Sequence, residues 1–379
     1  MKKIEVKKAG LGNMDFGMFA LTIALLCIGL VMVASASSYH ALYYYGDSNY
    51  LFIRQLVFGV IGTVAMIIIS KIDYRKYKRW SYIGFAFAAL LLLLVLTPLG
   101  RTANGAKRWL GFGILRFQPS EIMKPMLVLA IATYLSRNTK KIKDIKGYIV
   151  PLIMLLIVGL LMYFQKHMSG LLVLGVAALS VIFTSGIKLN FKTIIAIVLI
   201  VALAVTAFIT ADKFRLQRIF SFMNPEQDIL DGNWQPAQSL YAIGSGGLFG
   251  MGLGQSREKY LWLPEAQNDF IFSILAEELG FVGAVSVVLL FTLFIFRGYR
   301  IAMTCKDFYG SMIAAGITSI FALQFIINIA VVTCTIPVTG MPLPFFSYGG
   351  TSLFINLCSM GIVLNISKNC NKVADTREE

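Results

Sequence analysis

The 379-residue sequence has few charged side chains and very few of the residues that build metal or disulfide sites. Charged residues make up 14% of the chain, and the two histidines, His40 and His167, are too few to form a metal site by themselves. The five cysteines show no paired spacing, so no disulfide framework or metal–thiolate site is predicted. No internal repeat is visible, which argues weakly against the repeat-built transporter folds. The cysteines are Cys27, Cys305, Cys334, Cys358 and Cys370.

Hydrophobic residues, in contrast, make up 57% of the sequence, and the mean hydropathy is +0.74. Roughly 20 consecutive apolar residues span a bilayer, and the chain offers such runs many times over. The sequence therefore predicts an all-α polytopic membrane protein in which residues 1–379 form one integral membrane domain of ten transmembrane helices. The predicted spans lie near 16–36, 51–70, 81–98, 119–136, 148–164, 168–187, 193–210, 269–296, 309–333 and 347–367.

Basic residues predict the orientation, because cytoplasmic loops are enriched in lysine and arginine. If both termini are cytoplasmic, 22 of the 34 basic residues lie on the inner side, including those of the tails 1–14 and 368–379. Anionic inner-leaflet lipid then accounts for the net charge of +15, and no nucleic acid is implied. The other twelve cluster at 99–118 and in a large outer loop, 211–268, between spans seven and eight. Singly these are ordinary solvated charges, but together they indicate an anion handled at the outer face.

The chain is organised around the stretch from Tyr241 to Gly280, which passes from a glycine-rich segment into an apolar run. Asp269 lies at the point of entry, where a carboxylate is costly unless it has a function. The simpler interpretation is that Asp269 begins the following helix, since acidic residues suit helix N-termini. Its position alone leaves both interpretations open.

The other candidate residues lie in the outer loops and at the ends of the spans. Glu121 and Lys124 share one helix face and can pair, as a structural ion pair or in direct contact with a substrate, and both should face a cavity or a partner. His167 can donate to a phosphate or bond to the backbone. We expect Glu277 and Glu278, about two turns beyond Asp269, to brace their helix by pairing with a neighbouring span.

Two further stretches predict irregular backbone near the outer face. The prolines between 337 and 344 forbid a regular helix there, so this backbone must be buried or line a wet cavity, which points to an outward-facing cleft. A run of glycines lets the backbone approach a ligand closely, or simply forms tight turns and close helix contacts. These glycines are Gly244, Gly246, Gly247, Gly250, Gly252 and Gly254.

At these residues the sequence resembles the SEDS family (shape, elongation, division and sporulation), which includes RodA, FtsW and SpoVE. The resemblance covers nearly the whole chain. Its most specific segments are NGAKRW (104–109), QPSEIMK (118–124), GSGGLFGMGLGQSREKYLWLPEAQNDFIFSILAEELG (244–280) and PVTGMPLPFFSYGGTSL (337–353). The sequence of residues 255–270 is more similar to the division and sporulation branch of the family than to the elongation branch.

The resemblance implies a bacterial cytoplasmic-membrane glycosyltransferase that polymerises lipid II outside the membrane, in cell division or sporulation. It also implies a class B penicillin-binding protein as partner, besides membrane lipids and other divisome or sporulation proteins. The family's essential outer-loop acid falls on Asp269, and the glutamate and lysine of its fourth span fall on Glu121 and Lys124. The remaining predicted substrate-binding residues are Arg101, Arg108, Trp109, His167, Arg257, Lys259 and Ser347.

Two departures from the family pattern concern the site. The family's frequent Gln-Pro-Asp-Leu-Gly-Thr is replaced here by residues 165–170, Gln-Lys-His-Met-Ser-Gly, so His167 stands in for the usual aspartate. Cys334 occupies a place where glycine is expected, and local helix packing can differ there.

The predicted mechanism is a single inverting displacement, with Asp269 as the general base toward the acceptor sugar hydroxyl. Positive charge must then surround the departing polyprenyl pyrophosphate, with or without a divalent cation such as Mg or Mn. Candidates for that charge are Lys124, Arg108, Arg101 and Arg257. Two other functions fit the same features: a lipid II flippase, and a non-catalytic scaffold for the penicillin-binding protein.

Overall fold

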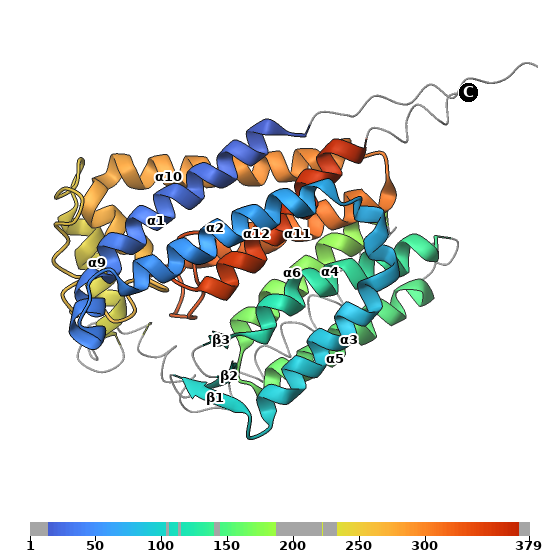
Figure 1. Cartoon of the computed structure of the whole chain (residues 1–379), viewed down its shortest axis with the longest axis horizontal. Helices are drawn as coiled ribbons and strands as arrows, with labels where there is room; N and C mark the ends of the chain where they lie inside the picture. The colour runs from blue at the N-terminus through green and yellow to red at the C-terminus, as the bar shows by residue number, and fades with distance from the viewer. Residues whose placement is uncertain are drawn as a thin grey trace, which may run out of the picture.

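The computed structural model describes residues 14–103, 106–112, 115–139, 145–186, 222 and 233–370. The predicted seventh span (193–210), the outer-loop residues 211–232 other than 222, and most of both predicted tails lie outside the described residues. Within the described part, every predicted span coincides with a helix, so the mostly helical, polytopic architecture is confirmed (Figure 1). Six of these helices are long and apolar enough to cross a membrane, and two shorter apolar ones lie at 149–164 and 168–184.

The helices form one elongated bundle in which neighbours in sequence run antiparallel. Within it, α3 packs on α4, α2 on α12, and α10 on α11. Their bounds are α1 Phe16–Tyr45, α2 Tyr50–Lys71, α3 Tyr77–Leu96, α4 Pro119–Arg137, α5 Ile149–Phe164, α6 Met168–Thr184, α9 Trp234–Ser245, α10 Ile271–Thr304, α11 Phe308–Val332 and α12 Gly350–Asn369, with short 3₁₀ turns at Tyr74–Lys76 and Ile145–Tyr148.

The expectation of an all-α fold is wrong in one segment. Between α3 and α4 the chain forms a three-stranded antiparallel sheet of β1 Gly100–Ala103, β2 Ala106–Phe112 and β3 Leu115–Phe117, in the order β1-β2-β3. Arg101 on β1 faces Trp109 on β2 across the ladder. The basic, glycine-containing sequence suggested a loop, but three successive segments pair their backbone groups instead.

Because neighbouring helices alternate in direction, α2, α4, α6, α10 and α12 all begin at one end of the bundle, the end that carries the sheet and α9 (Figure 1). We call it the site end. A helix N-terminus carries unpaired N–H groups and about half a positive charge, so several such termini converge here. These N-termini make the site end suited to negatively charged groups. The opposite end, where α3 and α11 begin, is called the basic end.

Helix α10 is kinked at Gly280, whose φ of 67° and ψ of −169° are not helical. The glycine-rich segment crosses α10 at this kink: the Phe281 and Val282 N–H groups donate to the carbonyls of Gly247 and Leu248, while Met251 N–H donates to Glu277 O. The backbone groups freed by the kink are thus satisfied by the outer segment. Gly246 and Gly250 accordingly lie against the backbone of α10, as the second interpretation of the glycine run expects.

Replacing Gly250 with alanine is expected to destabilise this crossing. Gly250 has a φ of +81°, and a Cβ at this position would lie 2.2 Å from the backbone oxygen of Glu278, which cannot move aside. We expect the variant to lose about 1–3 kcal/mol in its free energy of unfolding, visible as earlier thermal unfolding in detergent. Gly244→Ala is the matched control, because nothing lies within 4 Å of its Cβ position. Equal unfolding temperatures for the two variants would contradict this account.

The cysteine prediction also needs correction. Cys305, at the end of α10, and Cys370, at the end of α12, form a disulfide with their Cα atoms 5.2 Å apart. Their separation of 65 positions hides the pairing in the sequence, and only the packing of the helix ends brings them together. This pair lies away from the site end.

Candidate functional site

Asp269 lies in the turn that precedes α10, with its side chain partly buried. The backbone oxygen of Asp269 accepts a hydrogen bond from the Asn328 side-chain amide at 2.8 Å, and the same amide donates to Met341 O at 2.8 Å. The N-cap of α10 is Phe270, and no side chain caps this helix. The simpler interpretation, that Asp269 serves to begin the helix, is therefore not supported by the geometry.

The irregular segment 334–349 forms one wall beside Asp269. Tyr348 N–H donates to Gln267 O at 2.9 Å, and the Ser347 hydroxyl donates to Asn268 O at 2.6 Å while accepting from Leu343 N–H at 2.7 Å. The predicted irregular backbone is thus confirmed, and most of its residues between 341 and 347 are buried in protein, as membrane depth requires. The Ser347 hydroxyl is occupied by these backbone bonds, which fix the turn before Asp269, and its contact with substrate stays a prediction.

The Asp269 carboxylate receives no hydrogen bond from any described residue, and Gly340 lies beside it, its Cβ position 3.4 Å from Oδ2. Burial, reinforced by the Glu265 carboxylate, raises the pKa of Asp269 to about 7, although the Arg108 guanidinium opposes this shift. A carboxyl group with such a pKa exists in both protonation states near neutral pH. It can therefore accept a proton from a hydroxyl more readily than an ordinary aspartate.

The charge of Arg108 on β2 acts on this carboxylate, and the Arg108 guanidinium donates to the backbone oxygen of Lys166 in the α5–α6 turn. The next residue, His167, is buried, its Nδ1 has no partner among the described residues, and its Nε2 lies 3.4 Å from the Gln118 amide nitrogen. Burial, together with the cations Arg108 and Lys124, holds the pKa of His167 well below its usual range. His167 is therefore neutral, and its Nδ1 is available to a ligand that binds beside it.

Glu121 and Lys124 form a buried ion pair in the first turns of α4, with Lys124 Nζ 2.7 Å from Glu121 Oε1 and side-chain exposures of 5% and 3%. The other Glu121 oxygen accepts from the Ser352 hydroxyl on α12 at 3.1 Å. The predicted pairing is confirmed. The pair faces the bundle interior, and the field of Lys124 reaches His167, so the ion pair belongs to the same cluster as Arg108 and Asp269.

Comparison with known proteins places this chain in a family. The family model described as cell cycle protein, FTSW_RODA_SPOVE, matches residues 16–372. The chain belongs to this FtsW/RodA/SpoVE family. It is 42% identical to stage V sporulation protein E of Bacillus subtilis, with 93% of this chain and 97% of the relative covered. It is 37% identical to a probable peptidoglycan glycosyltransferase FtsW of Trichlorobacter lovleyi, with 97% and 96% covered.

Two solved structures are similar over almost the whole chain. A chain of a peptidoglycan synthase complex, studied for its coordination of polymerization and crosslinking, aligns with a TM-score of 0.78 and 28% identity, covering 94% of this chain and 98% of that one. The rod shape determining protein RodA of Thermus thermophilus aligns with a TM-score of 0.68 and 28% identity, covering 94% and 97%. The fold of this chain is therefore the fold of the FtsW/RodA/SpoVE family.

Four other predicted residues form no hydrogen bond or ion pair with Asp269 in the part of the chain that the structure describes. Lys259 is buried, and its ammonium is bound by Gly254 O, by Ser35 Oγ at 3.2 Å and by Glu278 Oε1 at 3.1 Å, which leaves it no free contact for a substrate. Arg101 on β1 and Arg257 in the outer segment are exposed. Trp109, opposite Arg101 on β2, is partly exposed. A substrate contact of these exposed residues stays a prediction.

The partners of Glu277 and Glu278 correct one expectation. Glu278 does bond to a neighbouring span, through Ser35 of α1, but it also pairs with Lys259 of the outer segment. Glu277 accepts from the Ser256 hydroxyl and from the Arg257 N–H, both in the outer segment rather than in a neighbouring span. The kink at Gly280 explains the difference, because it brings the outer segment against this turn of α10.

Sequence reasoning missed Asn328, which holds both Asp269 and the irregular wall in place. The available signal was an amide in the apolar run 309–333, since polar groups at membrane depth are usually bonded or functional. It also missed the left-handed backbone at Lys166 and Glu265, which flank the cluster with φ of 53° and 57°. Cys334, standing where the family pattern expects glycine, has a φ of 52° as well. Such conformations are costly without glycine and concentrate at functional sites.

The divalent cation that the sequence allows would need a group of ligating side chains. In the part of the chain that the structure describes, no group of three or more His, Cys, Asp or Glu side chains gathers to hold a metal ion. Asp269 has Glu265 as its acidic neighbour, and the pyrophosphate of a substrate would have to supply the remaining ligands. A role for Mg or Mn stays a prediction.

Proposed function

We propose that the protein is a peptidoglycan glycosyltransferase that polymerises lipid II, with Asp269 as the general base. One observation supports the proposal: a carboxylate that receives no hydrogen bond from any described residue, with its pKa raised to about 7, lies near the cation Arg108 at the site end of the bundle. The relatives named peptidoglycan glycosyltransferases and the similar synthase complex support this reaction.

In the proposed reaction Asp269 takes the proton from the acceptor hydroxyl. The oxygen of that hydroxyl attacks the anomeric carbon of the donor sugar. The bond between that carbon and the polyprenyl pyrophosphate breaks, and the pyrophosphate leaves with the electron pair. One such displacement inverts the anomeric centre. Arg108, Lys124 and the converging N-termini of α4 and α6 supply positive charge for the leaving phosphates, and a neutral His167 can donate to one of them.

The reaction requires the site end to face outward. We infer ten spans with both termini cytoplasmic, so that the basic end lies against the anionic inner leaflet. A class B penicillin-binding protein would then receive the strands outside the membrane, during division or sporulation. The described cations of the cluster gather at the site end and do not continue along the length of the bundle, which favours a polymerase over a lipid II flippase. A non-catalytic scaffold would not need a carboxylate at residue 269 that receives no hydrogen bond from any described residue.

The proposal is tested by the initial rate of strand formation from lipid II between pH 5 and 9, using the purified chain with a class B penicillin-binding protein, with and without divalent metal. Because burial raises the pKa of Asp269 to about 7, the base is protonated at lower pH. We expect the rate to fall about tenfold per pH unit below 7 and to level off above it. The chain without its partner serves as a comparison. A flat profile would remove the base assignment, and transfer of lipid II across vesicles without polymer would favour the flippase.

A further inference from the structure

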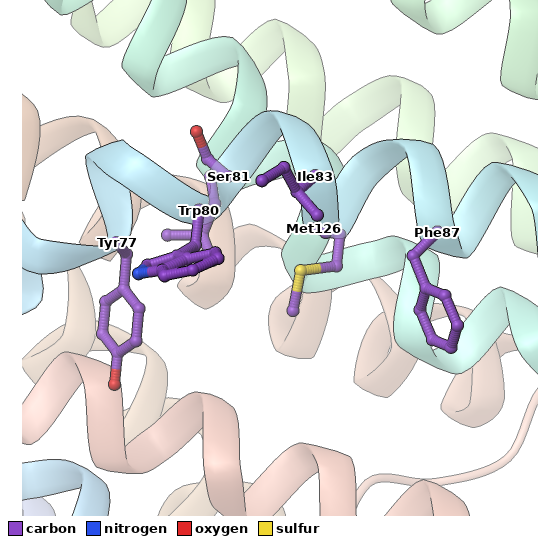
Figure 2. A pocket seen from close by; sticks show the side chains of 8 residues that line it. Tyr77, Trp80, Ser81, Ile83, Phe87 and Met126 are labelled. Atoms are coloured by element: carbon purple, nitrogen blue, oxygen red, sulfur yellow. The ribbon is translucent and has the colours of Figure 1, made fainter.

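A groove of about 350 Å³ runs between α3 and α4 (Figure 2), and none of the residues of the cluster around Asp269 lines it. Its lining includes Tyr77, Trp80, Ile83, Gly84, Phe87 and Met126. From Tyr77 to Phe87 the groove follows ten residues of α3, about 15 Å at the rise of an α-helix. The groove begins at the basic end of the bundle, where α3 starts.

The groove has the dimensions and chemistry of a site for a single hydrocarbon chain. Trp80, Ile83 and Phe87 are each more than half exposed and project from α3 as its rim. Between them Gly84 lets the Met126 side chain of α4 pack closely against α3, since a Cβ on Gly84 would lie 2.6 Å from the Met126 sulfur. Apolar surface alone cannot select a ligand inside a bilayer, because the surrounding lipid tails are equally apolar. Selection must come from polar groups at the mouth.

The mouth of the groove carries such groups. Lys76 and Arg79 are exposed there, and neither lies within 4 Å of a carboxylate of any described residue. The Arg79 guanidinium carbon lies 5.7 Å from the centre of the Trp80 ring, which places its charge beside the groove. The Trp80 N–H and the Tyr77 hydroxyl have no hydrogen-bond partner in the described ranges. Two cations and two free donors match a phosphate and the ester groups below it.

We propose that this groove binds one acyl chain of an anionic phospholipid, whose phosphate is bound by Lys76 and Arg79 at the mouth. The polyprenyl chain of the substrate is a poorer fit, because its pyrophosphate reacts at the site end while the cations of the groove lie at the basic end. The bound lipid would fill the α3–α4 seam beside the helix that carries Glu121 and Lys124. It would therefore be a structural lipid of the enzyme.

Native mass spectrometry of the full chain, offered dioleoyl phosphatidylglycerol and dioleoyl phosphatidylcholine in equal amounts, tests the proposal. We expect the phosphatidylglycerol adduct to dominate and to fall about thirtyfold in the double variant Lys76→Gln/Arg79→Gln, since each cation near an anionic headgroup contributes about a fivefold gain in binding. Arg300→Gln is the matched control, an exposed arginine on α10, which does not pack on α3. Equal retention of the two lipids, or an equal loss in the control, overturns the proposal.

The apolar part of the site has its own test. Gly84→Leu displaces the flexible Met126 side chain and narrows the groove, so it should lower phosphatidylglycerol retention without changing the cations. Phosphatidylglycerol with a photoreactive acyl chain should label residues 77–87 of the unmodified protein, a result that does not depend on any variant folding. Labelling elsewhere overturns the proposal, and so does displacement of the lipid by polyprenyl phosphate, which would make the polyprenyl chain the occupant.

Discussion

Asp269→Asn is expected to reduce the rate of glycan strand formation by about 10² to 10⁴-fold, the range typical for loss of a general base. The amide has nearly the same shape as the carboxylate but cannot accept the proton of the acceptor hydroxyl. Because no described residue donates a hydrogen bond to this carboxylate, the substitution breaks no contact that supports the fold. Thermal unfolding of the variant should therefore match that of the unmodified protein while polymer formation from lipid II is lost.

The matched control for this variant is Asp47→Asn, which changes an exposed carboxylate in the α1–α2 turn at the same end of the bundle. It should retain full activity, which separates a specific loss at residue 269 from a general effect of removing negative charge near the substrate. Normal polymer formation by Asp269→Asn would show that another group accepts the proton. In that case the pKa of Asp269 would have no part in the pH profile.

The second large effect is expected at the buried ion pair. Lys124→Met leaves Glu121 as an unpaired buried carboxylate, and breaking a buried pair in this way typically costs 3–5 kcal/mol in the free energy of unfolding. The Ser352 hydroxyl, 3.1 Å from the second Glu121 oxygen, cannot replace the lost charge. The measurement is thermal or denaturant unfolding of the purified protein, read beside strand formation.

A double variant distinguishes a structural ion pair from one that also acts on the substrate. Glu121→Gln/Lys124→Met removes both charges and should recover most of the lost stability, since neutral side chains replace a buried pair at little cost. If Lys124 stabilises the departing pyrophosphate, the double variant stays inactive although it is folded. Activity that returns together with stability would leave the pair with a structural role alone.

Much of the architecture could be predicted from local sequence. Apolar runs that satisfy their own backbone hydrogen bonds must be helices in a bilayer, which is why every predicted span within the described residues corresponds to one. The i, i+3 spacing likewise placed Glu121 and Lys124 on one face, and they do pair. The sheet at 100–117 escaped prediction because strand pairing depends on contacts between segments, which no single stretch of sequence reveals.

The sequence by itself determined a membrane bundle, the position of Asp269 at the start of a span, and a set of cations near it. Which cations join that carboxylate was decided only by tertiary structure. Arg108 approaches because the sheet folds back over the α5–α6 turn, whereas Lys259 is drawn away to Glu278 by the kink at Gly280. Helical periodicity fixes neighbours three and four residues apart, but partners separated by tens of residues meet only through packing, and the pKa of Asp269 depends on those partners.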